Sequence, residues 1–282
     1  MLKLIEALFE TNALRVCPDG QPFWYTSGTI GPYYINTHFL YGSEREANEL
    51  LALIDEAARE PDGCSARVAA AAMAQYEKNA VYRGTTDEIV PAAKALSPGR
   101  FAAISGGERR DWFFSLPAAI LLKKPHITIF KNGGGRLFDG TASAPVPDLG
   151  GGEVLHIADL VTEASSYVRA WIPAVRGFGG KMTASISVVD RNQCGADILR
   201  EHGVEPHALV TVDSGLFEAA ERIGRISPAQ RAMLEAFREA PHGAMRAFLL
   251  EHPEFLQNAL QSDQKTAQRA KLCIEQDLYH LQ

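Results

Sequence analysis

Five short apolar runs follow one another between residues 100 and 212, and stretches of helical character separate them. Each run is too short for a helix, and most lack the alternation of a strand with one exposed face. Alternating strands and helices predict right-handed βαβ crossovers and a parallel sheet, so we expect an α/β fold. Ligands of such sheets lie at the carboxyl ends of the strands. The runs are Phe101–Ile104, Ile127–Phe130, Val154–Ile157, Ile186–Val189 and Ala208–Val212.

The regions on either side of these runs have a different character. Residues 1–20 are expected to form a helix that ends at Pro18–Gly20, and Phe23–Leu40 is rich in aromatic and β-branched residues, which predicts a β-ribbon. Ser43 and Glu46 form a capping box before a helix that continues to about Arg59. Further helices are expected over 66–78, 228–239, 242–251, 253–261 and 263–280, and a surface loop is expected between the glycine runs 133–135 and 150–152.

Composition excludes several classes of protein. The 282-residue chain carries a formal charge of -6 and no dense Lys/Arg cluster, which argues against nucleic-acid binding. The longest apolar runs are shorter than the ~18 residues that a membrane span needs, and the acidic N-terminus does not resemble a signal peptide, so we expect a cytoplasmic protein without membrane contact. The four cysteines form no CxxC pair and the histidines show no metal-binding spacing, so no protein-only metal site is expected.

The segment Val154–Ser166 is the most informative for function. It contains an apolar strand, Asp159, two apolar residues and a loop of small polar residues that leads into a helix. Such a loop exposes backbone N–H groups at a helix start, which suits a phosphate, and Asp159 is placed to accept hydrogen bonds from sugar hydroxyls. An ordinary strand-to-helix turn with Thr162 or Ser165 as the N-cap remains the alternative.

Several motifs in this order resemble the orotate phosphoribosyltransferases, which belong to the type I phosphoribosyltransferases. The segment Val154–Ser166 is similar to the signature that binds phosphoribosyl diphosphate (PRPP) in that family. Phe23–Asn36 resembles the family's N-terminal substrate segment, and Ser105–Arg110 its diphosphate loop. Val188–Gln193 resembles the segment whose arginine faces orotate. The resemblance covers roughly residues 1–213.

This resemblance implies a fold, a reaction and a set of site residues. The fold would be a type I phosphoribosyltransferase-like parallel sheet flanked by helices, within 1–215, with an N-terminal hood inside 1–42 and a C-terminal helical appendage over 216–282. The reaction would transfer phosphoribosyl from Mg²⁺-bound PRPP to a pyrimidine-like base, and family members form homodimers. The implied catalytic residues are Asp159, Lys131 and Arg136; the PRPP and phosphate ligands are Asp159, Thr162, Glu163, Ser165, Ser166, Arg109 and Arg110; the base ligands are Tyr33, Tyr34 and Arg191.

Structural roles remain open for several of these residues. Tyrosines in an aromatic-rich strand often serve packing, Arg109 and Arg110 are equally compatible with a solvated loop, and Asp190–Arg191 with a strand-end ion pair.

The chain also departs from the family pattern. Ala158 replaces the first acid of the signature, and Glu163 and Ala164 stand where Thr and Gly are usual. A glutamate near a phosphate dianion costs on the order of 1–4 kcal/mol, depending on screening. Thr26 replaces a lysine, and the cationic loop after the second core strand is reduced to Asn132–Arg136. These departures predict weakened or altered catalysis. The alternative is a non-catalytic regulator that binds PRPP or a nucleotide, or a structural partner subunit.

Overall fold

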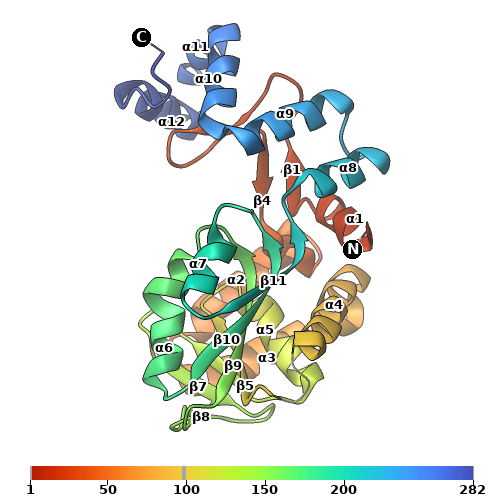
Figure 1. Cartoon of the computed structure of the whole chain (residues 1–282), viewed down its shortest axis with the longest axis vertical. Coiled ribbons are helices and arrows are strands. Elements are labelled where there is room, and N and C mark those ends of the chain that lie inside the picture. The colour runs from red at the N-terminus through yellow and green to blue at the C-terminus, as the bar shows by residue number, and fades with distance from the viewer. Residues whose placement is uncertain (1, 97–99, 282) are drawn as a thin grey trace. The chain divides into compact units, whose positions relative to one another are not determined.

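The computed structural model describes residues 2–96 and 100–281, and its centre is a seven-stranded sheet with the order β11-β10-β9-β5-β6-β7-β8 (Figure 1). The strands from β11 to β6 are parallel, as the sequence predicts. Each of the five apolar runs overlaps one of them: β5 Ala103–Gly107, β6 His126–Ile129, β9 Glu153–Val161, β10 Lys181–Asp190 and β11 Glu205–Thr211.

Two short antiparallel strands complete the sheet where the sequence predicts a surface loop. β7 (Gly135–Phe138) pairs with β6, and β8 (Ser143–Pro145) pairs with β7. The turn between them is closed by Asp139, whose Oδ1 accepts hydrogen bonds from the backbone N–H groups of Thr141 and Ala142, each at 2.8 Å. Pairing with β6 gives this polar segment backbone partners that its own composition does not indicate.

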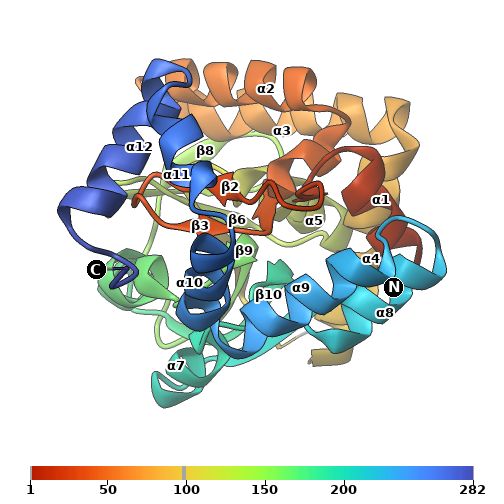
Figure 2. The same ribbon diagram turned by 90° about the horizontal axis from the view of Figure 1, so that it is seen from above.

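Helices cover both faces of the sheet. α3 (Pro61–Lys78), α4 (Ala80–Leu96) and α5 (Trp112–Leu122) lie on one face, and α6 (Ile172–Gly177) and α7 (Gly195–Glu201) lie on the other. α2 (Glu44–Ala57) runs beside α3 (Figure 2). Ser43 accepts a hydrogen bond from the N–H of Glu46 at 3.2 Å, which confirms the predicted start of α2.

The first helix is shorter than predicted. α1 (Leu2–Glu10) ends before Asn12, which adopts a φ of 57°, and the chain continues as strand β1 (Leu14–Val16). A left-handed φ at a non-glycine residue interrupts helical hydrogen bonding. Together with α2, α3 and the sheet, α1 belongs to a compact unit formed by residues 1–13 and 36–212.

A second compact unit contains residues 14–35 and 213–282. Its strands pair as two antiparallel ribbons: β1 with β4 (Tyr33–Ile35), and β2 (Phe23–Trp24) with β3 (Ile30–Gly31). Residues 14–35, which lie inside the expected hood, group with the C-terminal residues. The helices of this unit are α8 Ser214–Arg222, α9 Pro228–Glu239, α10 Pro241–Glu251, α11 Glu254–Leu260 and α12 Gln264–Glu275.

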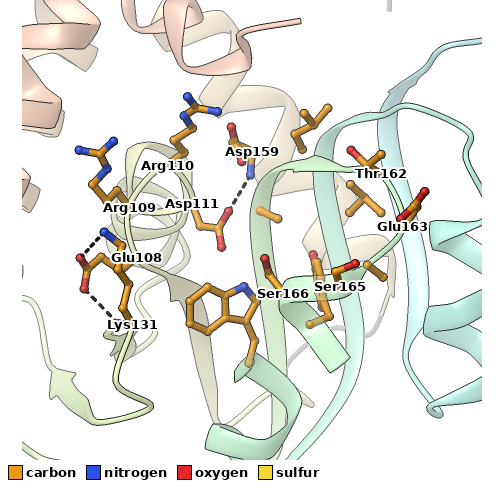
Figure 3. Close-up of a pocket in the computed structure, with 16 residues that line it drawn as sticks. Glu108, Arg109, Arg110, Asp111, Lys131, Asp159, Thr162, Glu163, Ser165 and Ser166 are labelled. Atoms are coloured by element: carbon orange, nitrogen blue, oxygen red, sulfur yellow. Dashed lines mark hydrogen bonds and ion pairs between the residues drawn. The ribbon is translucent and has the colours of Figure 1, made fainter. Parts of the chain in front are cut away.

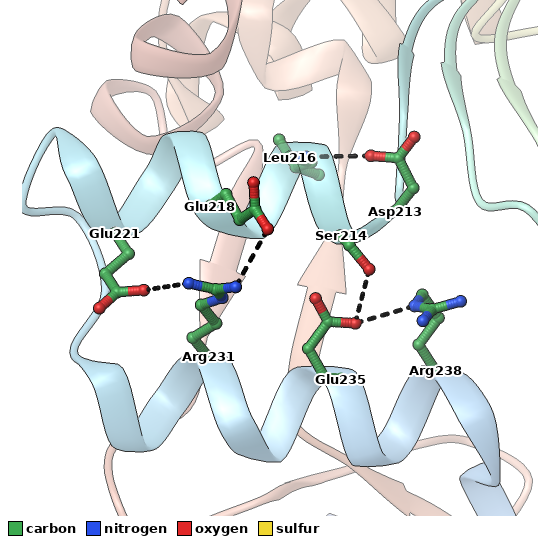
Figure 4. Close-up of polar contacts among 8 residues, drawn as sticks. All are labelled: Asp213, Ser214, Leu216, Glu218, Glu221, Arg231, Glu235 and Arg238. Carbon is green, nitrogen blue, oxygen red and sulfur yellow. Dashed lines mark hydrogen bonds and ion pairs between the residues drawn. The ribbon is translucent and has the colours of Figure 1, made fainter.

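Polar contacts join α8 to α9 (Figure 4). Arg231 on α9 pairs with Glu218 at 3.1 Å and with Glu221 at 2.9 Å, both on α8. Ser214 Oγ donates to Glu235 Oε2 at 2.9 Å. α9 begins with a complete capping box between Ser227 and Gln230, at the start that the sequence predicts.

None of the helices within residues 2–96 and 100–281 is both long and apolar enough to cross a membrane.

Candidate functional site

A cavity of about 430 Å³ lies at the carboxyl ends of β5 and β9 (Figure 3), where the α/β fold predicts a ligand site. Three segments form its wall: the loop after β5, Lys131 shortly after β6, and the end of β9 with the turn that follows it. Most of the predicted phosphate and catalytic residues therefore meet in one place. The lining residues are Glu108 to Asp111, Lys131, Ala158 to Tyr167, and Trp171.

The loop of residues 162–166 forms one side of the cavity. β9 ends at Val161, and a π-helical turn, Tyr167–Trp171, follows the loop and leads into α6. Ala164 adopts a left-handed φ of 51°, a conformation that favours glycine. This backbone brings Thr162, Ser165 and Ser166, which carry hydroxyl groups, to the lining of the same cavity, directly before the π-helical turn. Hydroxyl and N–H donors in this arrangement suit a phosphate.

Two buried carboxylates form the opposite part of the wall. Asp159, on β9, is 7% exposed, and Asp111, directly before α5, is 8% exposed. The backbone N–H of Asp159 donates to Asp111 Oδ1 at 3.2 Å, and the N–H of Gly107 donates to Asp111 Oδ2 at 2.9 Å. Burial, together with the charge of Asp111, raises the pKa of the Asp159 carboxyl group, and Arg110 opposes this shift.

Asp111 was not predicted as a site residue. The segment identified from the sequence, Ser105–Arg110, ends one residue before it. The signal that points to Asp111 is its position in the loop after a parallel strand, directly after the segment that resembles the family's diphosphate loop.

A buried histidine lies behind Asp111. His156 is fully buried, its Nδ1 lies 2.9 Å from Ser105 Oγ, and its Nε2 lies 3.3 Å from Asp111 Oδ2. Its ring stacks on Trp171 with a centroid separation of 6.5 Å. A Cβ atom at Gly107 would lie 2.2 Å from Trp171, so only glycine allows the indole to approach β5 this closely.

Three of the basic side chains near the cavity are paired with carboxylates. Arg109 forms an ion pair with Asp55 of α2, and Lys131 Nζ lies 3.4 Å from Glu108 Oε1. Arg136 does not line the cavity. It lies on β7 in a neighbouring hollow of about 440 Å³, where its Nε is 2.6 Å from Asp62 Oδ1.

Arg110 differs from these three. Among the residues that the structure describes, no carboxylate forms an ion pair with Arg110. Its charge opposes the rise in the pKa of Asp159 and adds to the effect of burial in lowering the pKa of His38. Arg110 is therefore the basic side chain of the cavity wall best placed to meet an anion.

The predicted base ligands come from two different units. Arg191 follows β10, and its backbone N–H donates to the carbonyl of Val161 at 2.9 Å. Tyr33 and Tyr34 lie on β4 in the second unit. There Tyr34 lies 5.0 Å from the ring of Phe23 between centroids, and Tyr33 lies 5.8 Å from that of Phe237. Their roles in base binding stay predictions.

The donor set of the cavity suits a magnesium ion that is shared with a ligand. No group of three His, Cys, Asp or Glu side chains within the described residues could hold a metal ion. Mg²⁺ keeps several waters and binds largely through substrate phosphates, so an ion that arrives with a phosphorylated ligand needs few protein ligands in this acidic cavity.

The sheet, its flanking helices and the strand-end cavity define the fold as that of the type I phosphoribosyltransferases. Leishmania donovani UMP synthase is among the solved structures that match this fold. The match has a TM-score of 0.56 and 20% identity, and it covers 84% of this chain and 42% of the UMP synthase chain. Orotate phosphoribosyltransferase from Francisella tularensis, with a TM-score of 0.52 and 14% identity, covers 83% of this chain and 96% of its own.

A sequence comparison shows the more particular similarity. The chain is 42% identical to the orotate phosphoribosyltransferase of Halobacterium salinarum over 69 residues, which are 24% of this chain and 38% of that protein. No protein-family model matches the chain. The resemblance to orotate phosphoribosyltransferases predicted from the motifs is thus confirmed, over little more than a third of the curated relative's length.

Proposed function

We propose that the chain binds PRPP in the cavity of Figure 3 and transfers its phosphoribosyl group to a pyrimidine-like base, with weakened or altered catalysis. The observation that carries this proposal is the meeting of three chemistries in one cavity. They are the hydroxyl loop 162–166, the buried carboxylate of Asp159 and the guanidinium of Arg110. A 5-phosphorylated ribose that carries a diphosphate needs donors for its phosphate, acceptors for its hydroxyls and positive charge for its diphosphate.

Each part of the ligand has a proposed partner. The 5′-phosphate would accept hydrogen bonds from the hydroxyls of Thr162, Ser165 and Ser166. Asp159 would accept hydrogen bonds from ribose hydroxyls, and Arg110 would lie against the diphosphate. Mg²⁺, when bound with PRPP, would neutralise part of the diphosphate charge.

The reaction is a substitution at the anomeric carbon. A ring nitrogen of the base forms the new bond to that carbon, and the bond to the diphosphate oxygen breaks, so that diphosphate leaves with both bonding electrons. Catalysis of such a step depends on holding the two reactants in line and on stabilising the charge of the leaving group.

The basic side chains explain why we expect this catalysis to be weak. Arg109, Lys131 and Arg136 already have carboxylate partners, so a diphosphate would compete with Asp55, Glu108 and Asp62 for them. Glu163 adds a negative charge to the lining of the phosphate loop. The similarities are to phosphoribosyltransferases and do not favour the non-catalytic alternative.

Calorimetric titration with Mg-PRPP, followed by orotate and orotidine monophosphate, tests the proposal. We expect micromolar binding of PRPP, at least tenfold weaker in Arg110→Gln because a charge-assisted contact is lost. Arg176→Gln, which removes an exposed arginine of α6, is the matched control and should bind like the wild type. Release of diphosphate with orotate as acceptor would then measure turnover. No heat with any of the three ligands would contradict the proposal.

A further inference from the structure

Asp111 stands at the start of a helix, but its carboxylate lines the cavity. It stands at the N-terminal end of α5, yet its side chain makes no capping hydrogen bond to that helix. Its carboxylate faces β5 and β9 instead and lines the cavity beside Asp159. The side chain retains 11% of its exposure, so a ligand in the cavity can reach it.

The acceptor capacity of this carboxylate is not exhausted. A carboxylate offers about four lone-pair positions. Oδ2 receives the N–H of Gly107 at 2.9 Å and lies 3.3 Å from His156 Nε2. Oδ1 receives the N–H of Asp159 at 3.2 Å. The Asp159 carboxyl group is also a hydrogen-bond neighbour of Asp111, so a ligand hydroxyl would take the place of that contact.

The neighbouring carboxylates of Asp111 and Asp159 call for a compensating donor. Burying two like charges side by side is unfavourable unless a proton, a cation or hydrogen-bond donors compensate them. A pair of adjacent sugar hydroxyls supplies two donors to such a pair. Ala158, the neighbour of Asp159 on β9, has no polar side-chain atom to contribute, and the carboxylate in contact with Asp159 is that of Asp111.

His156 lies directly behind Asp111, with its Nε2 3.3 Å from Oδ2. The histidine is fully buried and is itself held between Ser105 and the ring of Trp171. Ser105 and His156 are directly opposite one another in the pairing of β5 and β9, so the position of the imidazole is set by the sheet. The backbone N–H groups of Gly107 and Asp159 orient the Asp111 carboxylate in front of this histidine before any ligand arrives.

We propose that Asp111 is a ligand-binding residue whose carboxylate accepts one hydroxyl of a ribose 5-phosphate unit while Asp159 accepts the adjacent one. The pair Asp111–Asp159 then selects ribose over deoxyribose. This inference rests on the proposed function, because it assumes that the cavity receives a phosphorylated sugar.

The test is calorimetric titration with ribose 5-phosphate and with its 2-deoxy and 3-deoxy forms, in the presence of a chelator so that no divalent ion contributes. The wild type is expected to bind each deoxy form about tenfold or more weakly, as the loss of a hydrogen bond to a charged group implies. Asp111→Asn should lose the preference for one of the two hydroxyls, and Asp159→Asn should lose the preference for the other. Asp197→Asn, the same change at an exposed position on α7, should leave both preferences intact.

Each outcome decides between the two proposals. If the wild type binds ribose 5-phosphate but Asp111→Asn retains both hydroxyl preferences, the role of Asp111 is overturned while the proposed function stands. If the wild type binds none of the sugar phosphates, the proposed function fails and this inference fails with it. Should Asp111→Asn not fold, Asp159→Asn decides: a remaining preference for one hydroxyl supports the second acceptor, and complete loss of preference overturns it.

Discussion

Glu163 and Ala164 are the residues at which the loop 162–166 departs from a simple phosphate cradle. Glu163 is an exposed acid that lines the cavity, and Ala164 is buried with a left-handed φ. The first residue affects the charge that a phosphate meets, and the second affects the energy of the backbone that would bind it.

Replacing Glu163 by threonine is expected to strengthen binding of inorganic phosphate and of PRPP by about two- to tenfold. The change removes a negative charge that lies a few ångströms from the predicted phosphate position, and solvent screens part of the effect. Titration calorimetry at low salt measures it, with Glu201→Thr, an exposed acid at the end of α7, as the control. An affinity unchanged by Glu163→Thr would mean that the loop does not meet the phosphate.

Ala164→Gly is expected to change the free energy of unfolding by less than about 1 kcal/mol. Glycine relieves the left-handed strain, worth about 1–2 kcal/mol. It also loses a buried methyl group, worth about 0.8 kcal/mol, and gains unfolded-state entropy worth roughly 0.5–1 kcal/mol. Ala72→Gly, at a fully buried position in α3, has no strain to relieve and should cost about 2 kcal/mol. Urea unfolding of the two variants compares them, and equal losses would show that Ala164 is not strained.

At the scale of elements, carboxylates on α2 and α3 form ion pairs with two of the arginines that the diphosphate would need. Asp55 near the end of α2 pairs with Arg109, and Asp62 at the start of α3 pairs with Arg136. Both pairs are partly exposed, so solvent weakens them and a strong anion can compete for the arginine.

Asp55→Asn is therefore expected to raise the affinity for Mg-diphosphate about two- to fivefold, because Arg109 no longer has a carboxylate partner on α2. Glu56→Gln is the matched control: it lies one residue further along the same helix and breaks the pair with Arg67, at 2.9 Å, away from the cavity lining. Equilibrium titration with Mg-diphosphate measures both. Equal affinities in the two variants would show that the pair of Arg109 and Asp55 does not limit anion binding.

At the scale of the whole molecule, buried histidines make stability depend on pH. Burial lowers the pKa of His126 to about 3, and burial with the charges of Arg110 and Arg109 lowers that of His38 to about 3. The unfolded chain takes up these protons as the pH falls through 6.5, whereas the folded chain stays neutral at both sites until about pH 3. The unfolded state therefore binds more protons in this window, and the histidines reduce stability as the pH falls.

The Asp159 carboxyl group acts in the opposite direction, because its raised pKa lets the folded state keep a proton that the unfolded state loses.

A variant of one histidine separates the effect of the histidines on stability from that of Asp159. In His126→Gln, the loss of unfolding free energy between pH 6.5 and pH 3 should be smaller than in the wild type. His207→Gln, an exposed position on β11, should leave the slope unchanged. Urea unfolding across this pH range gives the slopes, and an unaltered slope in His126→Gln would contradict the prediction.

Much of the fold could be predicted from the sequence because the responsible interactions are local. Four of the five apolar runs form strands that the parallel sheet buries on both faces, and the fifth forms the half-buried edge strand β11. Ser43 and Ser227 begin helices because their hydroxyls accept N–H groups three residues away. The phosphate loop could be located for the same reason, as it follows directly from the end of β9.

The tertiary structure decided which distant residues meet. Asp111 and Asp159 are 48 positions apart, and they become neighbours only because β5 lies beside β9 in the sheet. Arg136 was predicted beside the other catalytic residues, but its strand, β7, pairs at the far side of β6 and places it against Asp62. Strand order and packing determine such long-range contacts, and no local sequence pattern encodes them. The sequence by itself therefore determined the class of fold and the loop that suits a phosphate, whereas the carboxylate pair and the partners of the basic side chains depended on the tertiary structure.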